Sequence, residues 1–412
     1  MNGWKEYKLS ELLEIPIRNG LTKPKSIRGQ GVKMIGMKEI FAYDIIRDCE
    51  MELVPVTEKE MCTSSILQDD LLFARQSLTL EGAGKCSIVG SVSDPTVFES
   101  HLIRLRINKN LANPYYIYYY FNSKYGKEQI KGLVQQVAAA GIRGKELINL
   151  RLSIPSLPSQ QKIANILSSL DDKIEVNRRI NEQLEELAGA LFKSWFVDFE
   201  PFKDGEFVDS ELGMIPKGWK VGKFTDIVEI KGGGTPKTDI AEYWNGDIPF
   251  FTPKDINDVF CIDTEKNITD LGLLKCSSKL YCKNTVFITA RGTVGKVCMA
   301  GRNMAMNQTC YALIGKEKYG QHFIYMQTIN IVERMKKKAN GAVFSAITTR
   351  DFDSEKIIIP SLDVVNDFLI KIEPLYESIL HNQQEIHHLT TLRDTLLPNL
   401  MSGEIDVNEV EI

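Results

Sequence analysis

The sequence lacks long apolar runs and paired cysteines. No uninterrupted apolar stretch among its 412 residues approaches the roughly 18–20 residues that a membrane-spanning helix needs. The first residues, Met1 to Glu6, also lack the apolar segment of a secretory signal. Its eight cysteines are scattered without a CxxC pair. We therefore expect a cytoplasmic protein with reduced thiols, no membrane contact, and neither disulfides nor a zinc site.

Motifs for catalysis are also missing. Gly84-Lys85 and Gly295-Lys296 are followed by Cys86 and Val297, whereas a phosphate-binding loop needs Ser or Thr there. The run Asn113-Pro114-Tyr115-Tyr116 lacks the second proline of the Asn-Pro-Pro-Tyr loop of adenine methyltransferases, and it favours the start of a helix instead. No proline is followed by Asp, which excludes the usual nuclease metal motif. We expect no catalytic, metal-binding or cofactor-binding residue in this chain.

An excess of positive charge is absent overall but present locally. The formal net charge is −4. Residues 1–155 carry +4 and residues 213–360 carry +6, whereas residues 156–212 carry −6 and residues 361–412 carry −8. Because phosphates respond to local potential, two mildly basic segments between acidic ones remain compatible with DNA binding.

The sequence contains an internal repeat. Four short matches recur in the same order at offsets that drift from 215 to 205: Gly3-Trp4-Lys5 with Gly218-Trp219-Lys220, Glu14-Ile15 with Glu229-Ile230, Gly84-Lys85 with Gly295-Lys296, and Ile154-Pro155-Ser156-Leu157 with Ile359-Pro360-Ser361-Leu362. Such a repeat indicates two modules of one kind.

Each half ends in a heptad pattern. Its seam residues, spaced alternately by four and three, are Ile163, Leu167, Leu170, Ile174, Asn177, Asn181, Leu184, Ala188, Leu191 and Trp195, and the same positions 205 residues later. This period of 3.5 is typical of a coiled coil. Two amphipathic helices on separate cores are the alternative. Asn177 and Asn382 at matching positions favour mutual pairing. The pairing is expected to be antiparallel, because the linker from Glu200 to Lys217 could lead back along a helix of about 60 Å only if almost fully stretched.

The predicted fold is α+β, with two mixed α/β domains joined by two long helices in an antiparallel coiled coil, related by a pseudo-two-fold repeat. Alternating residues at 101–107 and the run 285–289 predict strands, and Pro155, Pro158 and Pro360 separate the domains from the helices. The expected segments are domain 1 (1–155), helix 1 (156–200), a linker (201–217), domain 2 (218–360), helix 2 (361–403) and a C-terminal tail (404–412).

Motifs in the second half make the chain resemble a known family. These are Gly233-Gly234-Thr235-Pro236, Tyr243-Trp244, Gly246-Asp247-Ile248-Pro249, Asp255-Ile256, Arg291-Gly292 and Gly295-Lys296. In order and spacing they resemble a target recognition domain of the DNA-specificity subunits of type I restriction–modification systems. The first half departs from this pattern, with Arg18-Asn19-Gly20-Leu21-Thr22 in place of the glycine-rich motif.

The resemblance implies a non-catalytic subunit that reads a bipartite site on double-stranded DNA, one half-site per domain. It also implies two modification subunits, which methylate adenine, and restriction subunits as partners. S-adenosylmethionine, Mg²⁺ and ATP would bind those partners. A free-standing two-module DNA-binding protein is the alternative function, and an enzyme fused to its own recognition domains is a more distant one.

Polar and basic side chains in the two domains are the candidate DNA contacts, because they can donate to base edges or hold phosphates. Each of them taken singly is also typical of an ordinary solvated surface. The Gly-Lys elements recur in both halves, which makes them poor candidates for reading different sequences. The candidates are Arg75, Gln76, Lys85, Arg143 and Lys145 in the first domain, and Thr235, Lys237, Arg291, Lys296, Lys336, Lys337 and Lys338 in the second.

Overall fold

The computed structural model describes residues 4–136, 140–316, 318–338 and 346–407. The chain forms two compact units. Unit 1 contains residues 1–172 and 389–412, and unit 2 contains residues 173–388. Each unit therefore holds one predicted recognition domain together with parts of both long helices.

Unit 1 is built on a five-stranded sheet that is buried along its centre. The strand order is β2 (Arg18–Asn19), β10 (Leu102–Leu105), β6 (Leu71–Ala74), β8 (Cys86–Val89) and β4 (Ile45–Ile46). Every residue of β6, β8 and β10 is buried, as expected for strands covered on both faces. The expected strand near 101–107 is confirmed by β10.

Smaller sheets and, among the described residues, five short helices complete this unit beside its parts of the two long helices. β5 (Glu52–Val54), β3 (Val32–Ile35) and β9 (Thr96–Phe98) form one sheet, and β1 (Lys5–Lys8) pairs with β13 (Arg151–Ile154). The helices are α1 (Met37–Ala42), α2 (Glu58–Ser64), α3 (Pro114–Asn122), α4 (Lys124–Leu133) and α5 (Gly144–Leu147). The predicted helix start at Pro114 is confirmed, because the Asn113 Oδ1 accepts a hydrogen bond of 3.0 Å from the Tyr116 N–H.

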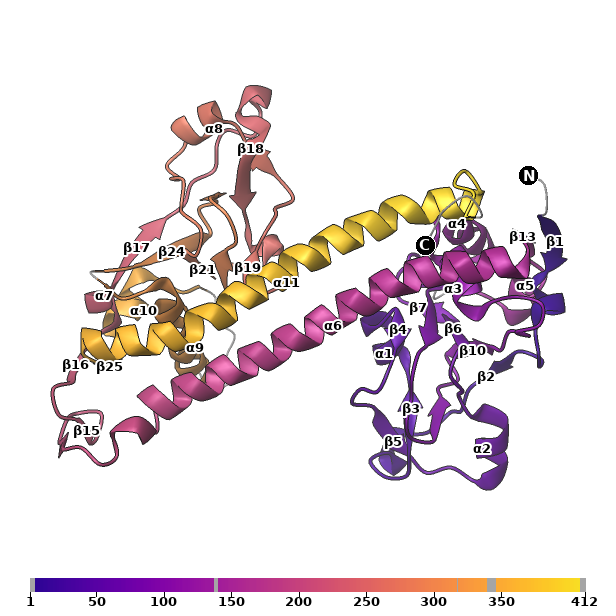
Figure 1. The fold of residues 1–412 in the computed structure, drawn as a ribbon, viewed down its shortest axis with the longest axis horizontal. Helices are drawn as coiled ribbons and strands as arrows, with labels where there is room; N and C mark the ends of the chain where they lie inside the picture. The colour runs from indigo at the N-terminus through magenta and orange to yellow at the C-terminus, as the bar shows by residue number, and fades with distance from the viewer. Residues whose placement is uncertain (1–3, 137–139, 317, 339–345, 408–412) are drawn as a thin grey trace. The chain divides into compact units, whose positions relative to one another are not determined.

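Unit 2 repeats this topology (Figure 1). Its main sheet runs β17 (Val228–Gly232), β24 (Cys310–Gly315), β21 (Val286–Thr289), β22 (Val297–Ala300) and β19 (Phe260–Cys261). A second sheet contains β20 (Asn267–Ile268), β18 (Trp244–Phe251) and β23 (Ala305–Met306), while β16 (Lys220–Lys223) pairs with β25 (Lys356–Ile359).

The parallel pairs show that the repeat is one of fold as well as sequence. In unit 2, β19 pairs in parallel with β22, and in unit 1, β4 pairs in parallel with β8. The second sheets match in the same way: β18 is parallel to β23 in unit 2, and β3 is parallel to β9 in unit 1. The remaining elements of unit 2 are β14 (Phe207–Val208), β15 (Ile215–Pro216), α7 (Phe224–Ile227), α8 (Asp270–Leu274), α9 (Gln321–Lys338) and α10 (Thr349–Ser354). The predicted fold class and internal repeat are confirmed.

Two long helices contribute to both units. They are α6 (Leu157–Phe196) and α11 (Leu362–Ser402). Within unit 2 they run antiparallel, because Asn177 contacts Glu385 while Asn181, further along α6, contacts Asn382. None of the helices in the described part of the chain combines the length and apolar character needed to cross a membrane.

The asparagines of the helix seams pair differently from the prediction. Asn382 donates to the Asn181 Oδ1 at 2.8 Å, whereas Asn177 donates to the Glu385 Oε2 at 2.7 Å. An antiparallel arrangement places position 382 beside 181, so the matching asparagines at 177 and 382 do not meet. Pro158 does not separate domain from helix either, because it is the second residue of α6, where its missing N–H has no helical partner to lose.

Candidate nucleic-acid interface

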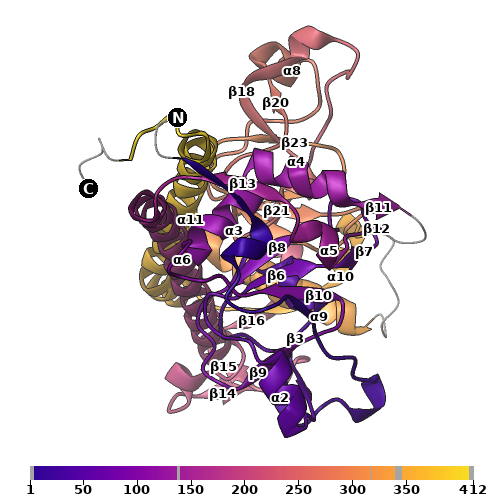
Figure 2. The ribbon, with the colours of Figure 1, turned by 90° about the vertical axis from the view of Figure 1, so that its right-hand side faces the viewer.

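In unit 1, several predicted contact residues gather where β6 ends. The Arg75 N–H donates to the His101 carbonyl oxygen at 2.7 Å, and the Arg75 carbonyl oxygen accepts from the Ile142 N–H at 2.9 Å. Next to it, β7 (Gln76–Ser77) pairs with β12 (Ala140–Gly141), which pairs with β11 (Gln135–Gln136) (Figure 2). We call residues 21–22, 75–76, 100–101 and 142–145 the first loop corner.

The side chains of this corner are polar and mostly accessible. Gln76, Arg143 and Lys145 are exposed, and Arg75 is partly buried beside the Ser100 carbonyl oxygen. Arg143 precedes α5 without using its side chain as a cap. The structure therefore brings four of the five candidates of this domain together as donors of hydrogen bonds.

Lys85 is placed differently. Its backbone belongs to the same hairpin, since the Lys85 carbonyl oxygen accepts from the Ala74 N–H at 2.9 Å. Its ammonium group lies 3.1 Å from the Asp44 carboxylate and donates to the Phe41 carbonyl oxygen at 3.3 Å. The geometry thus gives Lys85 a structural contact within the unit, and a role in DNA binding stays a prediction.

Unit 2 has an equivalent corner. The Ala290 N–H donates to the Thr309 carbonyl oxygen, and the Ala290 carbonyl oxygen accepts from the Ile347 N–H, both at 2.9 Å. The Thr235 hydroxyl contacts the Gln308 side-chain oxygen. We call residues 234–237, 290–296, 308–309 and 347–350 the second loop corner.

Most second-domain candidates lie at the second loop corner or next to it. Six of the seven are exposed and form no ion pair with a carboxylate in the described structure: Thr235, Lys237, Arg291, Lys296, Lys336 and Lys337. A Cβ atom at Gly295 would lie 3.5 Å from the Lys336 Cε, which places the end of α9 against the hairpin. Lys338 is also exposed, but its ammonium group lies 2.5 Å from the buried carboxylate of Glu355. Its charge is therefore partly neutralised within the protein.

The two corners share one backbone framework. The paired hydrogen bonds make Arg75 equivalent to Ala290 and Ile142 equivalent to Ile347. The turn glycines are also equivalent, because the Gly84 N–H donates to the Ala74 carbonyl oxygen as the Gly295 N–H does to that of Thr289. The residues that follow these three equivalent pairs correspond as well: Gln76 to Arg291, Lys85 to Lys296, Arg143 to Thr348 and Lys145 to Arg350.

Residues missed from the sequence emerge from this alignment. Gly20 and Gly233 both lie too close to a neighbouring strand for a side chain. A Cβ atom at Gly20 would collide with the Phe98 carbonyl oxygen, and a Cβ atom at Gly233 would collide with the Asn307 carbonyl oxygen. Gly20-Leu21-Thr22 is therefore the first-half counterpart of the glycine-rich motif, where the sequence alone indicated a departure. The newly found polar residues at the corners are Thr22, His101, Gln308 and Arg350, all of which are exposed. Aligning the halves on Gly20 and Gly233 could have found Thr22.

Two buried thiols and a buried histidine in the described part of the chain have the protonation behaviour of core groups. Burial raises the pKa of Cys261 and of Cys310 to about 12 and lowers that of His322 to about 4. A nucleophilic cysteine needs a lowered pKa, so these two thiols are poor nucleophiles. Among the described residues, no three His, Cys, Asp or Glu side chains are grouped to hold a metal ion.

The chain matches the family model described as "Type I restriction modification DNA specificity domain" twice, over residues 1–186 and 216–404. It is 29% identical over 395 residues to the type I restriction enzyme MjaIX specificity subunit of Methanocaldococcus jannaschii, covering 94% of this chain and 90% of that protein. It is 26% identical over 468 residues to the HindI specificity subunit of Haemophilus influenzae, covering 98% and 100%.

A solved structure has a similar fold. The crystal structure of the type I restriction–modification S subunit from M. genitalium superimposes with a TM-score of 0.62 at 14% sequence identity, covering 97% of this chain and 96% of that one. The two family matches coincide with the two halves of the internal repeat, each of which contains one loop corner.

Proposed function

Because the chain belongs to the type I restriction modification DNA specificity family, we propose that it reads a bipartite site on double-stranded DNA through its two loop corners. One corner would contact each half-site. The observation that carries this proposal is that the corners share a backbone framework but expose different side chains, as two readers of different sequences should.

The side chains at equivalent positions have different recognition chemistry. Gln76 can form two hydrogen bonds with the major-groove edge of adenine, whereas the equivalent Arg291 can do so with guanine. Arg143 can likewise form two hydrogen bonds with guanine, whereas the hydroxyl of the equivalent Thr348 can contact either base. The lysines at 145, 237, 296, 336 and 337 suit phosphates, which fix the position of a protein on the duplex without reading sequence.

The chain would supply recognition and leave the chemistry to its partners. We propose that two modification subunits and restriction subunits dock on it, and that S-adenosylmethionine, Mg²⁺ and ATP are held by those subunits. The family membership supports this division, and the absence of catalytic motifs in the sequence agrees with it.

Mapping the methylated motif tests the proposal. The full chain would be assembled with its modification subunits, and methylated adenines in genomic DNA would be mapped for the natural protein and for a variant in which residues 1–155 come from a relative of different specificity. We expect one half of the motif to change and the other to stay. A change in both halves would contradict one corner per half-site.

The chain alone provides the control. It should transfer no methyl group from S-adenosylmethionine, and it should bind its site more weakly than the assembled complex does. Full affinity and specificity without any partner would instead favour a free-standing DNA-binding protein.

A further inference from the structure

Two equivalent tryptophans have different surroundings in the two units. Trp4 precedes β1, in which Lys5 pairs with Ile154, and Trp219 precedes β16, in which Lys220 pairs with Ile359. Trp219 is only 8% exposed. Its ring centroid lies 5.6 Å from that of Phe199 and 5.1 Å from that of Phe202. Trp219 is therefore covered by aromatic side chains of its own chain.

An acidic segment supplies this cover. It follows α6 and reads Asp198-Phe199-Glu200-Pro201-Phe202. A left-handed backbone at Phe199 and a 3₁₀ turn at Glu200–Phe202 turn both phenylalanines inward. Phe202 also packs edge-on against Trp195, at 5.8 Å between centroids. We call residues 198–202 the aromatic cover.

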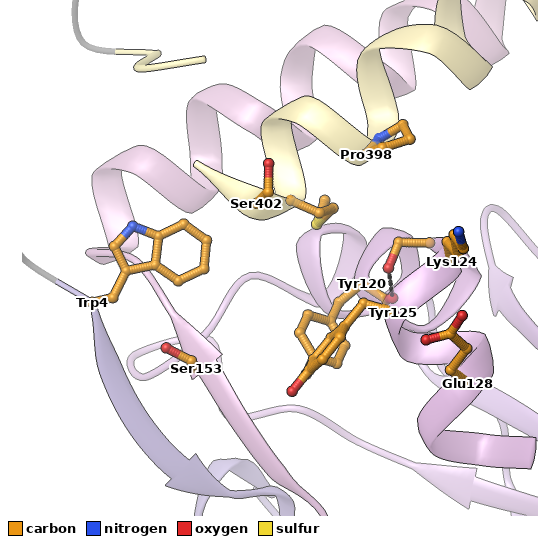
Figure 3. Close-up of a pocket in the computed structure, with 10 residues that line it drawn as sticks. Trp4, Tyr120, Lys124, Tyr125, Glu128, Ser153, Pro398 and Ser402 are labelled. Atoms are coloured by element: carbon orange, nitrogen blue, oxygen red, sulfur yellow. Dashed lines mark hydrogen bonds between the residues drawn. The ribbon is translucent and has the colours of Figure 1, made fainter. Parts of the chain in front are cut away.

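Among the described residues of unit 1, no aromatic side chain covers Trp4 in this way. The segment that follows α11 lies beside the ring instead, because a Cβ atom at Gly403 would lie 3.0 Å from the Trp4 ring. The two long helices repeat after 205 residues, so the positions equivalent to Phe199 and Phe202 are Glu404 and Val407. A cavity of about 420 Å³ opens beside Trp4. Its lining is largely apolar and comes from the residue before β1 and from β13, α3, α4 and α11: Trp4, Tyr120, Ser123, Lys124, Tyr125, Glu128, Ser153, Pro398, Met401 and Ser402 (Figure 3).

A break between two helices borders this cavity. In unit 1, Ser123 caps α4 through a hydrogen bond of 3.2 Å from the Gly126 N–H and so separates α4 from α3. The corresponding α9 of unit 2 is one continuous helix. Tyr120 and Tyr125, on either side of the break, pack edge-on at 5.8 Å and form one wall. Figure 3 shows Trp4 and Tyr125 on different sides of the space, below Pro398 and Ser402 of α11.

The rim next to the cavity is basic. An adjoining hollow of about 530 Å³ shares Lys124, Glu128 and Pro398 with it. This hollow is also lined by Lys127 and Lys131. Arg393 and Asp394 line it too, but the Arg393 guanidinium pairs with Asp394 and with Asp171, so the lysines give the rim its charge. A segment with aromatic side chains and flanking carboxylates would complement both the apolar cavity and this rim.

We propose that the cavity beside Trp4 binds an acidic segment carrying two phenylalanines, supplied by a partner protein subunit, in the way that the aromatic cover binds Trp219. The chain's own aromatic cover is already packed in unit 2, which is why the occupant is another chain. The inference rests on the proposed function only for the presence of partner subunits, and it concerns a surface outside the loop corners.

A peptide copy of the aromatic cover is the direct probe. Residues 197–206 would be synthesised and titrated into the full-length protein by calorimetry. We expect binding that weakens at least tenfold when both peptide phenylalanines are replaced by alanine. No binding of the natural peptide at millimolar concentration would overturn the proposal.

Variants that fill the cavity supply the matched test. Ser153→Phe and Ser402→Phe place a ring into the space from exposed positions on its lining, and each should weaken peptide binding at least tenfold. Ser91→Phe, at an exposed position outside the lining, is the control and should bind as the natural protein does. Lys124→Glu with Lys127→Glu should weaken binding through the rim. Equal affinities for Ser402→Phe and Ser91→Phe would overturn the proposal.

A photo-crosslinking amino acid at Ser402 identifies the occupant in the assembled complex. We expect a crosslink to an acidic, phenylalanine-containing segment of a modification or restriction subunit. A crosslink to a second copy of this chain, or to another part of the same chain, would overturn the proposal. If no complex assembles, the proposed function fails, and the peptide titration still decides what the cavity binds.

Discussion

Arg393 occupies a seam position of α11 at which the equivalent residue of α6 is Ala188. In unit 1 its guanidinium lies 2.7 Å from the Asp171 carboxylate, which also accepts a hydrogen bond of 2.6 Å from the Tyr119 hydroxyl. Asp171 is 8% exposed. The three residues thus tie α3, α6 and α11 together through a buried charge that has its partners.

Removing one partner of this network should be costly. Arg393→Met leaves the Asp171 carboxylate buried with one hydrogen bond, and we expect a loss of about 3–5 kcal/mol in the free energy of unfolding. Urea denaturation measures it. Asp171→Leu combined with Arg393→Met removes both charges, so the double variant should recover most of the loss. A double variant less stable than Arg393→Met would contradict this explanation.

His322 should make the stability of the chain sensitive to mild acid. Its ring is buried and stacks on Tyr376 at 5.0 Å, and burial lowers its pKa to about 4. Because the unfolded histidine titrates near 6.5, the unfolded state binds more protons between these values, and stability falls as the pH falls from about 6.5 toward 4.

The expected loss is about 2 kcal/mol between pH 7 and pH 5. His322→Gln should remove that part of the pH dependence, measured by denaturation at several pH values. His101→Gln, at an exposed position, is the control and should keep the slope of the natural protein. Parallel slopes for all three proteins would show that His322 is not the group responsible.

The second loop corner predicts two kinds of loss on DNA. Arg291→Ala should relax discrimination at one base pair of one half-site, by about 1–3 kcal/mol. Lys337→Ala should weaken binding about equally for all sequences and reduce the salt dependence. Competition binding of the assembled complex against site variants separates the two. If Arg291→Ala weakened all sites equally, it would be a phosphate contact.

At the scale of the element, the hairpin turn after β6 depends on a glycine. Gly84 has a φ of +81°, and a Cβ atom there would lie 2.2 Å from the Ile130 Cγ2. Gly84→Ala should therefore cost about 2–4 kcal/mol of unfolding free energy. Gly213, with a φ of +95° and no atom within 4 Å of its Cβ position, is the matched control. Gly213→Ala should cost only about 1 kcal/mol, and equal losses would show that the contact with Ile130 relaxes freely.

The elements that the sequence predicts well are those with a local pattern. The heptads locate α6 and α11 to within a few residues of their ends, and the Asn113 cap locates the start of α3. The seam pairing of the asparagines could not be predicted, because the pairing depends on the stagger between two helices. The continuous course of α11 through Pro374 and Pro398 also has no local signal.

The candidate site was predicted unevenly for a related reason. Exposed basic residues near glycine turns could be named from the sequence, and most of them lie at the loop corners. Arg350 was missed, because its equivalence with Lys145 follows from backbone hydrogen bonds between distant segments. Thr22 was missed for want of an alignment of Gly20 with Gly233. The inward turn of Lys85 toward Asp44 likewise depends on a tertiary contact.

At the scale of the whole molecule, the repeat predicts that half of the chain can imitate the other half. A fragment of residues 1–212 should dimerise through α6, with a second α6 in the place of α11. In such a dimer, Asp171 would face Ala188 of the other fragment instead of an arginine. Ala188→Arg should restore the ion pair and tighten the dimer at least tenfold. Sedimentation measures it, and two fragments that stay monomeric at micromolar concentration would contradict the interchangeability of the helices.

The composition of unit 1 also has a consequence for synthesis. Its core joins early residues such as Leu9 and Tyr116 to Leu400 and Met401 near the other end of the chain. During translation, unit 2 is therefore fully emerged before unit 1 has its last core residues, although unit 1 begins first. At 5–20 residues per second, the wait from residue 172 to residue 401 lasts roughly 10–50 s. Over that interval the nascent first half has an apolar surface that residues 396–407 cover in the folded protein, and it is then that a chaperone would be needed most.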